Sequence, residues 1–148
     1  MKKYLSGSLL LLLLGFCSGC KKYSNSSTTN TNVNNTPIAV TTGTWSITSY
    51  TQRTEDKTAS FAGVNFVFSS DGKLTASGTK TANGNWVFSA ASTGYYGTTQ
   101  ATFAISIGTN TPFDKLSRVW NIAEQTNTVL MLDNPEAVED EHITFSKK

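Results

Sequence analysis

The sequence predicts an all-β domain of about eight short antiparallel strands, arranged as an up-and-down meander that closes into a barrel. Short segments with alternating apolar and polar residues recur between turn dipeptides, which is typical of half-buried strands. Ser, Thr and Asn are abundant and favour strands and turns. No window carries an apolar pattern at helical spacing long enough for a confident helix. Closure is favoured because a closed barrel has no exposed edge strand.

The first nineteen residues have the features of a secretory signal peptide. Lys2 and Lys3 precede a leucine run at 9–14, and the small residues Ser18-Gly19 end the segment. The apolar run is too short to span a bilayer stably, so we expect cleavage. The chain therefore divides into a signal peptide at 1–19, a linking segment at 20–42 and a folded domain at 43–148.

The end of this leader resembles a bacterial lipoprotein signal, in which a cysteine after small residues is lipidated and becomes the new N-terminus. Cys20 follows Ser18-Gly19, whereas the competing Cys17 follows the bulky Phe16, so Cys20 is the expected lipidation site. The resemblance implies fatty acyl chains such as palmitate, attachment to a membrane and, without Asp after Cys20, the outer membrane of a Gram-negative bacterium. An ordinary cleaved signal with a free thiol is the alternative.

Residues 21–42 are rich in Ser, Thr and Asn and nearly lack aromatic residues. Such a segment buries too little apolar surface to offset the entropy of ordering the chain. We therefore expect a flexible tether between Cys20 and the domain.

The strands of the domain are expected in a simple order. The first has Trp45 and Ile47 on one face and Tyr50 on the other. Turns are predicted at Asp71-Gly72 and Asn83-Gly84, and Thr111-Pro112 can start a short helical turn. The seventh strand has four contiguous apolar residues, so its buried face is not predicted. The expected ranges are 45–50, 61–69, 73–78, 85–90, 100–107, 117–124, 128–133 and a last strand around 142–145.

Five motifs resemble the lipocalin-like lipoproteins common in Bacteroidetes. The resemblance covers about 43–148 and implies a calycin-type barrel on a lipid anchor, with no agreed catalytic residues. An avidin-type barrel opens similarly, but the later biotin-contacting residues of that family are not matched here. The motifs are Gly43-Thr44-Trp45, F-x-F-x-x-D-G-x-L from Phe66 to Leu74, Gly84-Asn85-Trp86, L-x-x-x-W from Leu116 to Trp120, and I-T-F-x-K from Ile143 to Lys147.

Aromatic residues are the candidate ligand-binding residues. Those on apolar strand faces either line a cavity for a small apolar ligand or simply fill the core. Tyr95 and Tyr96 lie between glycines in a predicted loop, where they either stack on a ligand or cap the barrel mouth. The strand candidates are Trp45, Phe66, Phe68, Trp86, Phe103 and Trp120.

Other site chemistries are poorly represented. The acidic segment Glu136–His142 near Asp133 matches no calcium loop and is expected to be solvated, so no metal site or cofactor is predicted. From Gly43 onward there are 8 basic and 10 acidic residues, which argues against a nucleic-acid partner. Nucleophile-elbow and phosphate-loop motifs are absent from the sequence, so an enzyme is not expected.

Two functional hypotheses follow. The first is a membrane-anchored, non-enzymatic envelope lipoprotein whose barrel binds a small hydrophobic ligand. The second is a structural or interaction lipoprotein with a filled barrel that acts through its surface and loops in an envelope complex.

Overall fold

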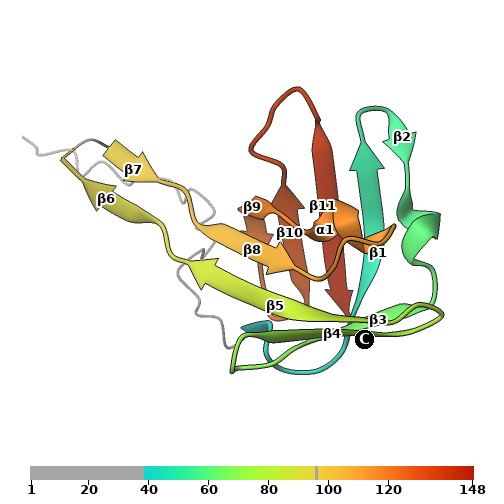
Figure 1. Cartoon of the computed structure of the whole chain (residues 1–148). Coiled ribbons are helices and arrows are strands. Elements are labelled where there is room, and N and C mark those ends of the chain that lie inside the picture. The colour runs from blue at the N-terminus through green and yellow to red at the C-terminus, as the bar shows by residue number, and fades with distance from the viewer. Residues whose placement is uncertain (1–38, 96) are drawn as a thin grey trace, which may run out of the picture.

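The computed structural model describes residues 39–95 and 97–148. They form a closed eight-stranded antiparallel β-barrel (Figure 1), which confirms the predicted fold class. The signal peptide, Cys20 and most of the predicted tether lie outside the described residues, as does Tyr96.

Each barrel strand pairs with the next barrel strand along the chain, and the last pairs with the first. The closing pair joins Trp45 to Lys147 and Gln52 to Glu141. Together these pairings make the predicted up-and-down meander. The barrel strands are β1 (Trp45–Gln52), β3 (Val64–Phe68), β4 (Lys73–Gly78), β5 (Ala82–Ser89), β8 (Thr102–Ser106), β9 (Val119–Gln125), β10 (Val129–Asp133) and β11 (Glu141–Lys147).

The remaining elements extend or close this barrel. The short strand β2 (Glu55–Asp56) pairs with the end of β1. A 3-10 turn, η2 (Thr58–Phe61), precedes β3, and the short helix α1 (Phe113–Leu116) lies between β8 and β9 where a helical turn was predicted. Finally, β6 (Ser92–Gly94) and β7 (Gly97–Thr99) pair only with each other in a separate two-stranded sheet.

Because neighbouring strands are antiparallel, the connections alternate between two ends of the barrel. The far end carries β2, η2, α1 and the loop at 134–140. The other end, which we call the tether end, carries the start of β1, the turns at 69–72 and 126–128, and the end of β11. Here the backbone N–H of Lys148 donates to the Thr44 carbonyl at 2.9 Å, so the two ends of the barrel chain are neighbours.

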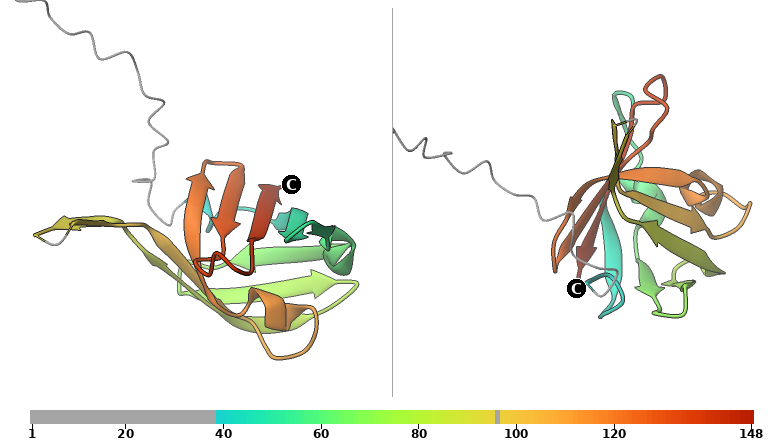
Figure 2. Two further views of the ribbon diagram at one scale, coloured as in Figure 1. Left: turned by 90° about the horizontal axis from the view of Figure 1, so that it is seen from above. Right: turned by 90° about the vertical axis from the view of Figure 1, so that its left-hand side faces the viewer.

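The hairpin of β6 and β7 also leaves the barrel at the tether end, between β5 and β8. We call residues 92–99 the arm. Figures 1 and 2 show the arm projecting well past the barrel wall. The sequence predicted a loop rich in small residues here and did not predict a projecting hairpin.

One predicted strand face is wrong. Tyr50 was placed opposite Trp45, but it is buried on the same inward side. The reason is a register shift between Ile47 and Ser49 in the pairing of β1 with β11. A bulge inserts one extra residue and reverses the alternation beyond it. The side chain of Tyr50 therefore reaches the interior at the far end.

Two predicted boundaries also need correction. Phe61 begins no strand, because it ends the turn η2, and β3 starts at Val64. Asn83-Gly84 is not a turn, since both residues pair with β4 inside β5. A Cβ on Gly84 would lie 2.0 Å from the Ser106 carbonyl oxygen, so this glycine permits close backbone approach within the sheet. By contrast, Asp71-Gly72 does form the predicted turn, with Gly72 at φ +82°.

The core is formed by inward-facing side chains from all around the single closed sheet. On β10, Leu130 and Leu132 face inward and Met131 faces outward, which settles the face that the contiguous apolar run left open. η2 and α1 add Phe61 and Phe113, whose ring centroids are 6.4 Å apart. These two rings cover the far end of the core.

Candidate functional site

The six aromatic residues predicted on strand faces all lie inside the barrel, and each is 0–5% exposed. Three of their rings contact one another: Trp86 stacks on Phe103 at 5.1 Å between centroids, and Phe68 meets Phe103 edge-on at 5.5 Å. Phe66 likewise packs edge-on against Phe145 at 5.3 Å. The space where a ligand was hypothesised is thus occupied by side chains, and an interior ligand site stays a prediction.

The three indole N–H groups are satisfied by the backbone. Trp45 donates to the Val40 carbonyl, Trp86 to that of Ser69 and Trp120 to that of Leu116, each at 3.0 Å. Buried indoles generally find such a partner. Trp45 and Trp86 fix chain segments at the tether end, while Trp120 fixes α1 at the far end. Each tryptophan therefore holds a segment that precedes or connects strands against the barrel.

Tyr95 does not join this group. It lies at the tip of the arm and is 97% exposed. The predicted set of ligand-binding aromatics therefore separates into a packed interior and an exposed tip. Tyr96 lies outside the described residues.

A buried charged cluster lies at the far end, and the sequence did not predict it. Glu141 was assigned to a solvated acidic segment, but it is 1% exposed. Its Oε1 accepts a hydrogen bond of 2.9 Å from the Tyr50 hydroxyl. Its Oε2 accepts one from the Arg118 guanidinium and one of 2.7 Å from the Asn134 amide. The only sequence signal was its position at the start of a strand with alternating apolar residues.

This cluster ties three strands together. Tyr50 comes from β1, Glu141 from β11, and Arg118 immediately precedes β9. Burial, followed by the hydrogen bond to Glu141, raises the pKa of the Tyr50 hydroxyl well above its usual range. The tyrosine is therefore a hydrogen-bond donor at physiological pH. The ionised side chains of Arg118 and Glu141 are paired with each other, and the cluster links side chains across the seam between β1 and β11.

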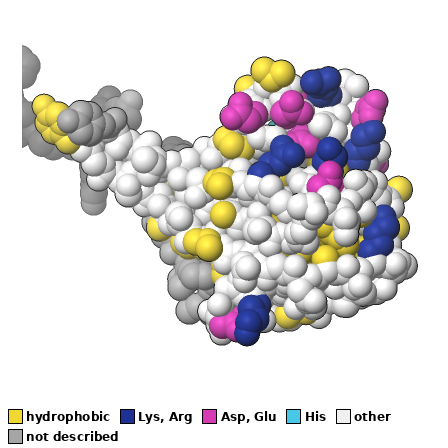
Figure 3. Space-filling view, viewed as in Figure 1, with side chains coloured by type: hydrophobic (Ala, Val, Ile, Leu, Met, Phe, Trp, Pro, Cys, Tyr) yellow, Lys and Arg dark blue, Asp and Glu magenta, His cyan; other side chains and the backbone are white. Residues whose placement is uncertain are grey.

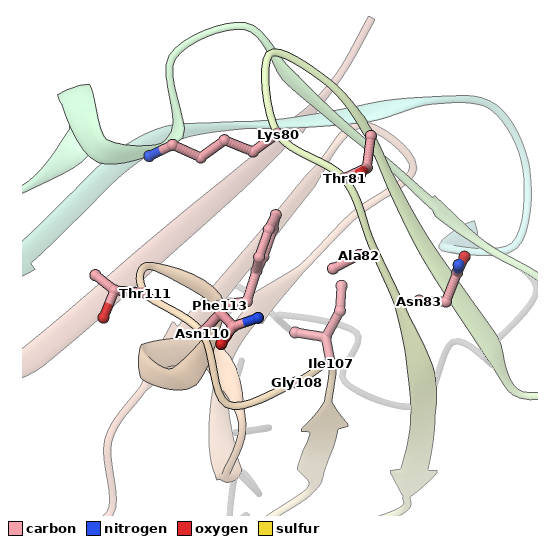
Figure 4. Close-up of a pocket in the computed structure, with 9 residues that line it drawn as sticks. All are labelled: Lys80, Thr81, Ala82, Asn83, Ile107, Gly108, Asn110, Thr111 and Phe113. Carbon is pink, nitrogen blue, oxygen red and sulfur yellow. The ribbon is translucent and has the colours of Figure 1, made fainter.

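Beside this cluster, a groove of about 450 Å³ opens at the same end. Figure 4 shows Lys80 and Thr81 on the turn between β4 and β5, with Asn110 and Thr111 on the connector across from them. Phe113 lies between these two walls. The other residues that line the groove are Ala82, Asn83, Ile107 and Gly108.

The walls of this groove are held by hydrogen bonds. The hydroxyl of Ser117 accepts from the Ile107 backbone N–H at 3.0 Å and donates to the Gly108 carbonyl at 2.9 Å. On the other side, Lys80 donates to the Ser60 carbonyl at 2.7 Å. The groove surrounds the edge of Phe113 with the side-chain amides, hydroxyls and ammonium of its walls, so its exposed lining is more polar than apolar.

His142 contacts two carboxylates on the outer surface of the far end. Its Nδ1 lies 2.7 Å from Asp133 Oδ1, and its Nε2 lies 3.1 Å from Asp140 Oδ1. The hydrogen bond to Asp133, followed by that to Asp140, raises the pKa of the imidazole. Within residues 39–95 and 97–148, no group of three His, Cys, Asp or Glu side chains is placed to hold a metal ion.

Fold and interior together define a small closed antiparallel β-barrel with a packed core. No protein-family model matches the chain, and no curated protein matches it. Among solved structures, the chain is similar to the crystal structure of a DUF4847 family protein from Bacteroides vulgatus, with a TM-score of 0.50 and 19% sequence identity. The match covers 74% of this chain and 94% of that chain. At this identity the likeness shows a shared fold, and the lipocalin-type assignment stays a prediction.

Proposed function

We propose that this protein is a cell-envelope lipoprotein, anchored through Cys20, whose packed barrel acts through its outer surface and projecting arm. The observation that carries the surface-acting role is the packing of the interior. Six aromatic side chains that were candidates for lining a cavity are 0–5% exposed, and the rings of Phe68, Trp86 and Phe103 contact one another. Of the two hypotheses from the sequence, this packing favours the filled barrel over the carrier of an internal ligand.

The anchor is supported by the leader sequence and the position of Cys20 after Ser18-Gly19. We propose the outer membrane of a Gram-negative cell as its location. No helix among the described residues is both long and apolar enough to cross a membrane. The test is detergent phase separation of the Cys20→Ala variant, which should move the protein from the detergent phase to the aqueous phase. Cys17→Ala is the matched control and should leave partitioning unchanged.

The filled barrel is tested by native mass spectrometry of residues 39–148. This boundary keeps Val40, which is buried and accepts the Trp45 hydrogen bond. We expect the bare protein mass and no shift in melting temperature across a panel of fatty acids, quinones and other apolar compounds. A reproducible additional mass that is lost on denaturation would instead establish an occupied barrel, since a ligand that binds only the native state stabilises it.

A second function is favoured by the groove at the far end. Its volume falls within the range of small-molecule sites, and its lining offers amide, hydroxyl and ammonium groups around Phe113. We propose that any small ligand of this protein binds there and not inside the barrel. If a ligand emerges from a thermal-shift screen, Asn110→Ala should weaken its binding. Thr93→Ala on the arm is the control and should leave ligand binding unchanged. Weaker binding by Thr93→Ala with unchanged binding by Asn110→Ala would exclude the groove.

A further inference from the structure

The arm differs from the rest of the protein in charge. Residues 81–113, which include β5, the whole arm and β8, contain no Asp, Glu, Lys, Arg or His. Figure 3 shows most of the visible charged side chains at the upper right of the molecule and one basic–acidic pair near the bottom of the barrel, whereas the arm carries none on the visible face. A long uncharged stretch on an exposed projection is unusual for a surface that only faces water.

The barrel is also polarised between its ends. At the tether end Lys73, Lys147 and Lys148 outnumber Asp71 and Glu124. The far end holds five basic and eight acidic side chains, a net charge of −3. The far-end residues are Arg53, Lys57, Lys80, Lys115 and Arg118 against Glu55, Asp56, Asp114, Asp133, Glu136, Glu139, Asp140 and Glu141.

We propose that the arm contacts the surface of the lipid bilayer and sets the orientation of the barrel on it. This inference rests on the proposed anchor at Cys20 for its direction. The chain that leads from Cys20 reaches the barrel at Trp45, at the end from which the arm projects. The arm therefore projects from the end at which the anchor is attached, and repulsion between the acidic far end and anionic lipid headgroups disfavours the opposite orientation.

The chemistry of the arm suits the headgroup region. Tyr95 at the tip is 97% exposed, and tyrosine rings are enriched at the level of the headgroups, where one edge is apolar and the other is hydrated. Pairing of β6 with β7 satisfies part of the arm's backbone, which lowers the cost of leaving bulk water. With no charged side chain, the arm has no ion to desolvate.

The test places a reporter at each end of an otherwise identical protein. Residues 20–148 contain Cys20 as their single cysteine, so the chain can be coupled to a maleimide lipid in vesicles of phosphatidylcholine and phosphatidylglycerol. Tyr95→Trp puts a reporter on the arm, and Val138→Trp puts one in the exposed far-end loop. The native tryptophans are buried at 0–5% exposure and provide a constant background.

Vesicles with brominated acyl chains should quench the added emission of the Tyr95→Trp protein and shift it to shorter wavelength. The added emission of the Val138→Trp protein should change little. Adding Thr98→Asp to the Tyr95→Trp protein should reduce the quenching, because Thr98 lies in the arm and a carboxylate resists the headgroup region. Equal quenching of both reporters, or none at either, would overturn the proposal.

The experiment also distinguishes membrane contact from self-association, and its result is independent of the anchoring test. A blue shift of the Tyr95→Trp protein that grows with protein concentration and occurs without vesicles would indicate a second copy as the occupant, and would also overturn the proposal. Because the anchor is supplied chemically, the result does not depend on whether cells lipidate Cys20. A failed partitioning test with Cys20→Ala would therefore reject the proposed function while leaving the vesicle result to be judged by itself.

Discussion

The hydroxyl of Tyr50 donates a 2.9 Å hydrogen bond to the carboxylate of Glu141, across the seam where the first and last strands close the barrel. A bulge in β1 turns this tyrosine inward. Glu141, at the start of β11, is held from the other side by Arg118 and Asn134. The seam at the far end thus carries a buried charged cluster in addition to the backbone hydrogen bonds between β1 and β11.

Tyr50→Phe should lower the free energy of unfolding by about 1.5–3 kcal/mol, because the bond it removes is to a buried, ionised group. The loss is measured by urea denaturation. Tyr95→Phe is a matched control on an exposed tyrosine and should change stability by less than about 0.5 kcal/mol. Equal effects of the two substitutions would contradict a special role for the Tyr50–Glu141 bond.

Phe103→Ala should cost about 3–5 kcal/mol, because the ring is fully buried between Trp86 and Phe68 and its removal leaves a cavity. Such a cavity is apolar and should take up benzene or xenon, which bind engineered cavities of this kind. Wild-type protein should bind neither, since its interior is filled. Calorimetry and denaturation are the measurements, and benzene binding to the wild type would show that the barrel holds a void.

Gly84→Ala should destabilise the protein by roughly 1–3 kcal/mol. The added methyl would meet backbone atoms of Ser106 and Ile107 at 2.0 and 2.5 Å, and backbone cannot move aside as a side chain does. Gly94→Ala is the control, since a Cβ there has no neighbouring atom within 4 Å. Its melting temperature should match the wild type, and a similar loss in both variants would disprove the close-approach argument.

The contacts of His142 should make stability depend on pH. Its pKa in the folded protein is raised above 6.5 by Asp133 and Asp140. The contribution is therefore fully present below pH 6.5 and is lost as pH rises through the folded-state pKa. As pH rises from about 5.5 to about 8.5, the denaturation midpoint of the wild type should fall more than that of His142→Gln. Parallel profiles would show that the two carboxylates do not hold the imidazole.

Local sequence signals predicted those features that local chemistry determines. Asp71-Gly72 forms its turn because glycine accepts the positive φ that the turn needs. Strand alternation at Phe66 and Phe68 was likewise sufficient to place both rings inside. These signals act within a few residues, and the meander follows from their order.

Features set by distant pairing could not be predicted in this way. The direction of Tyr50 depends on a bulge that forms only against β11. The local sequence of Gly84 suggests a turn, and only the position of β8 shows that it lies within the sheet. The local sequence of Glu141 suggests exposure, and only its contacts with Tyr50 and Arg118 show that it is buried. The groove beside Phe113 joins a turn to a connector about thirty residues away in the chain, without a motif in either.

The proximity of Thr44 and Lys148 has one more consequence. Chain ends that meet can be joined by a short peptide, and new ends can then be opened at an exposed turn, since such permuted chains are tolerated where few contacts cross the cut. Opening the barrel between Ala137 and Val138, in the exposed loop at the opposite end, would yield a circular permutant that is attached through its far end. The same barrel could then be displayed with its groove beside the support.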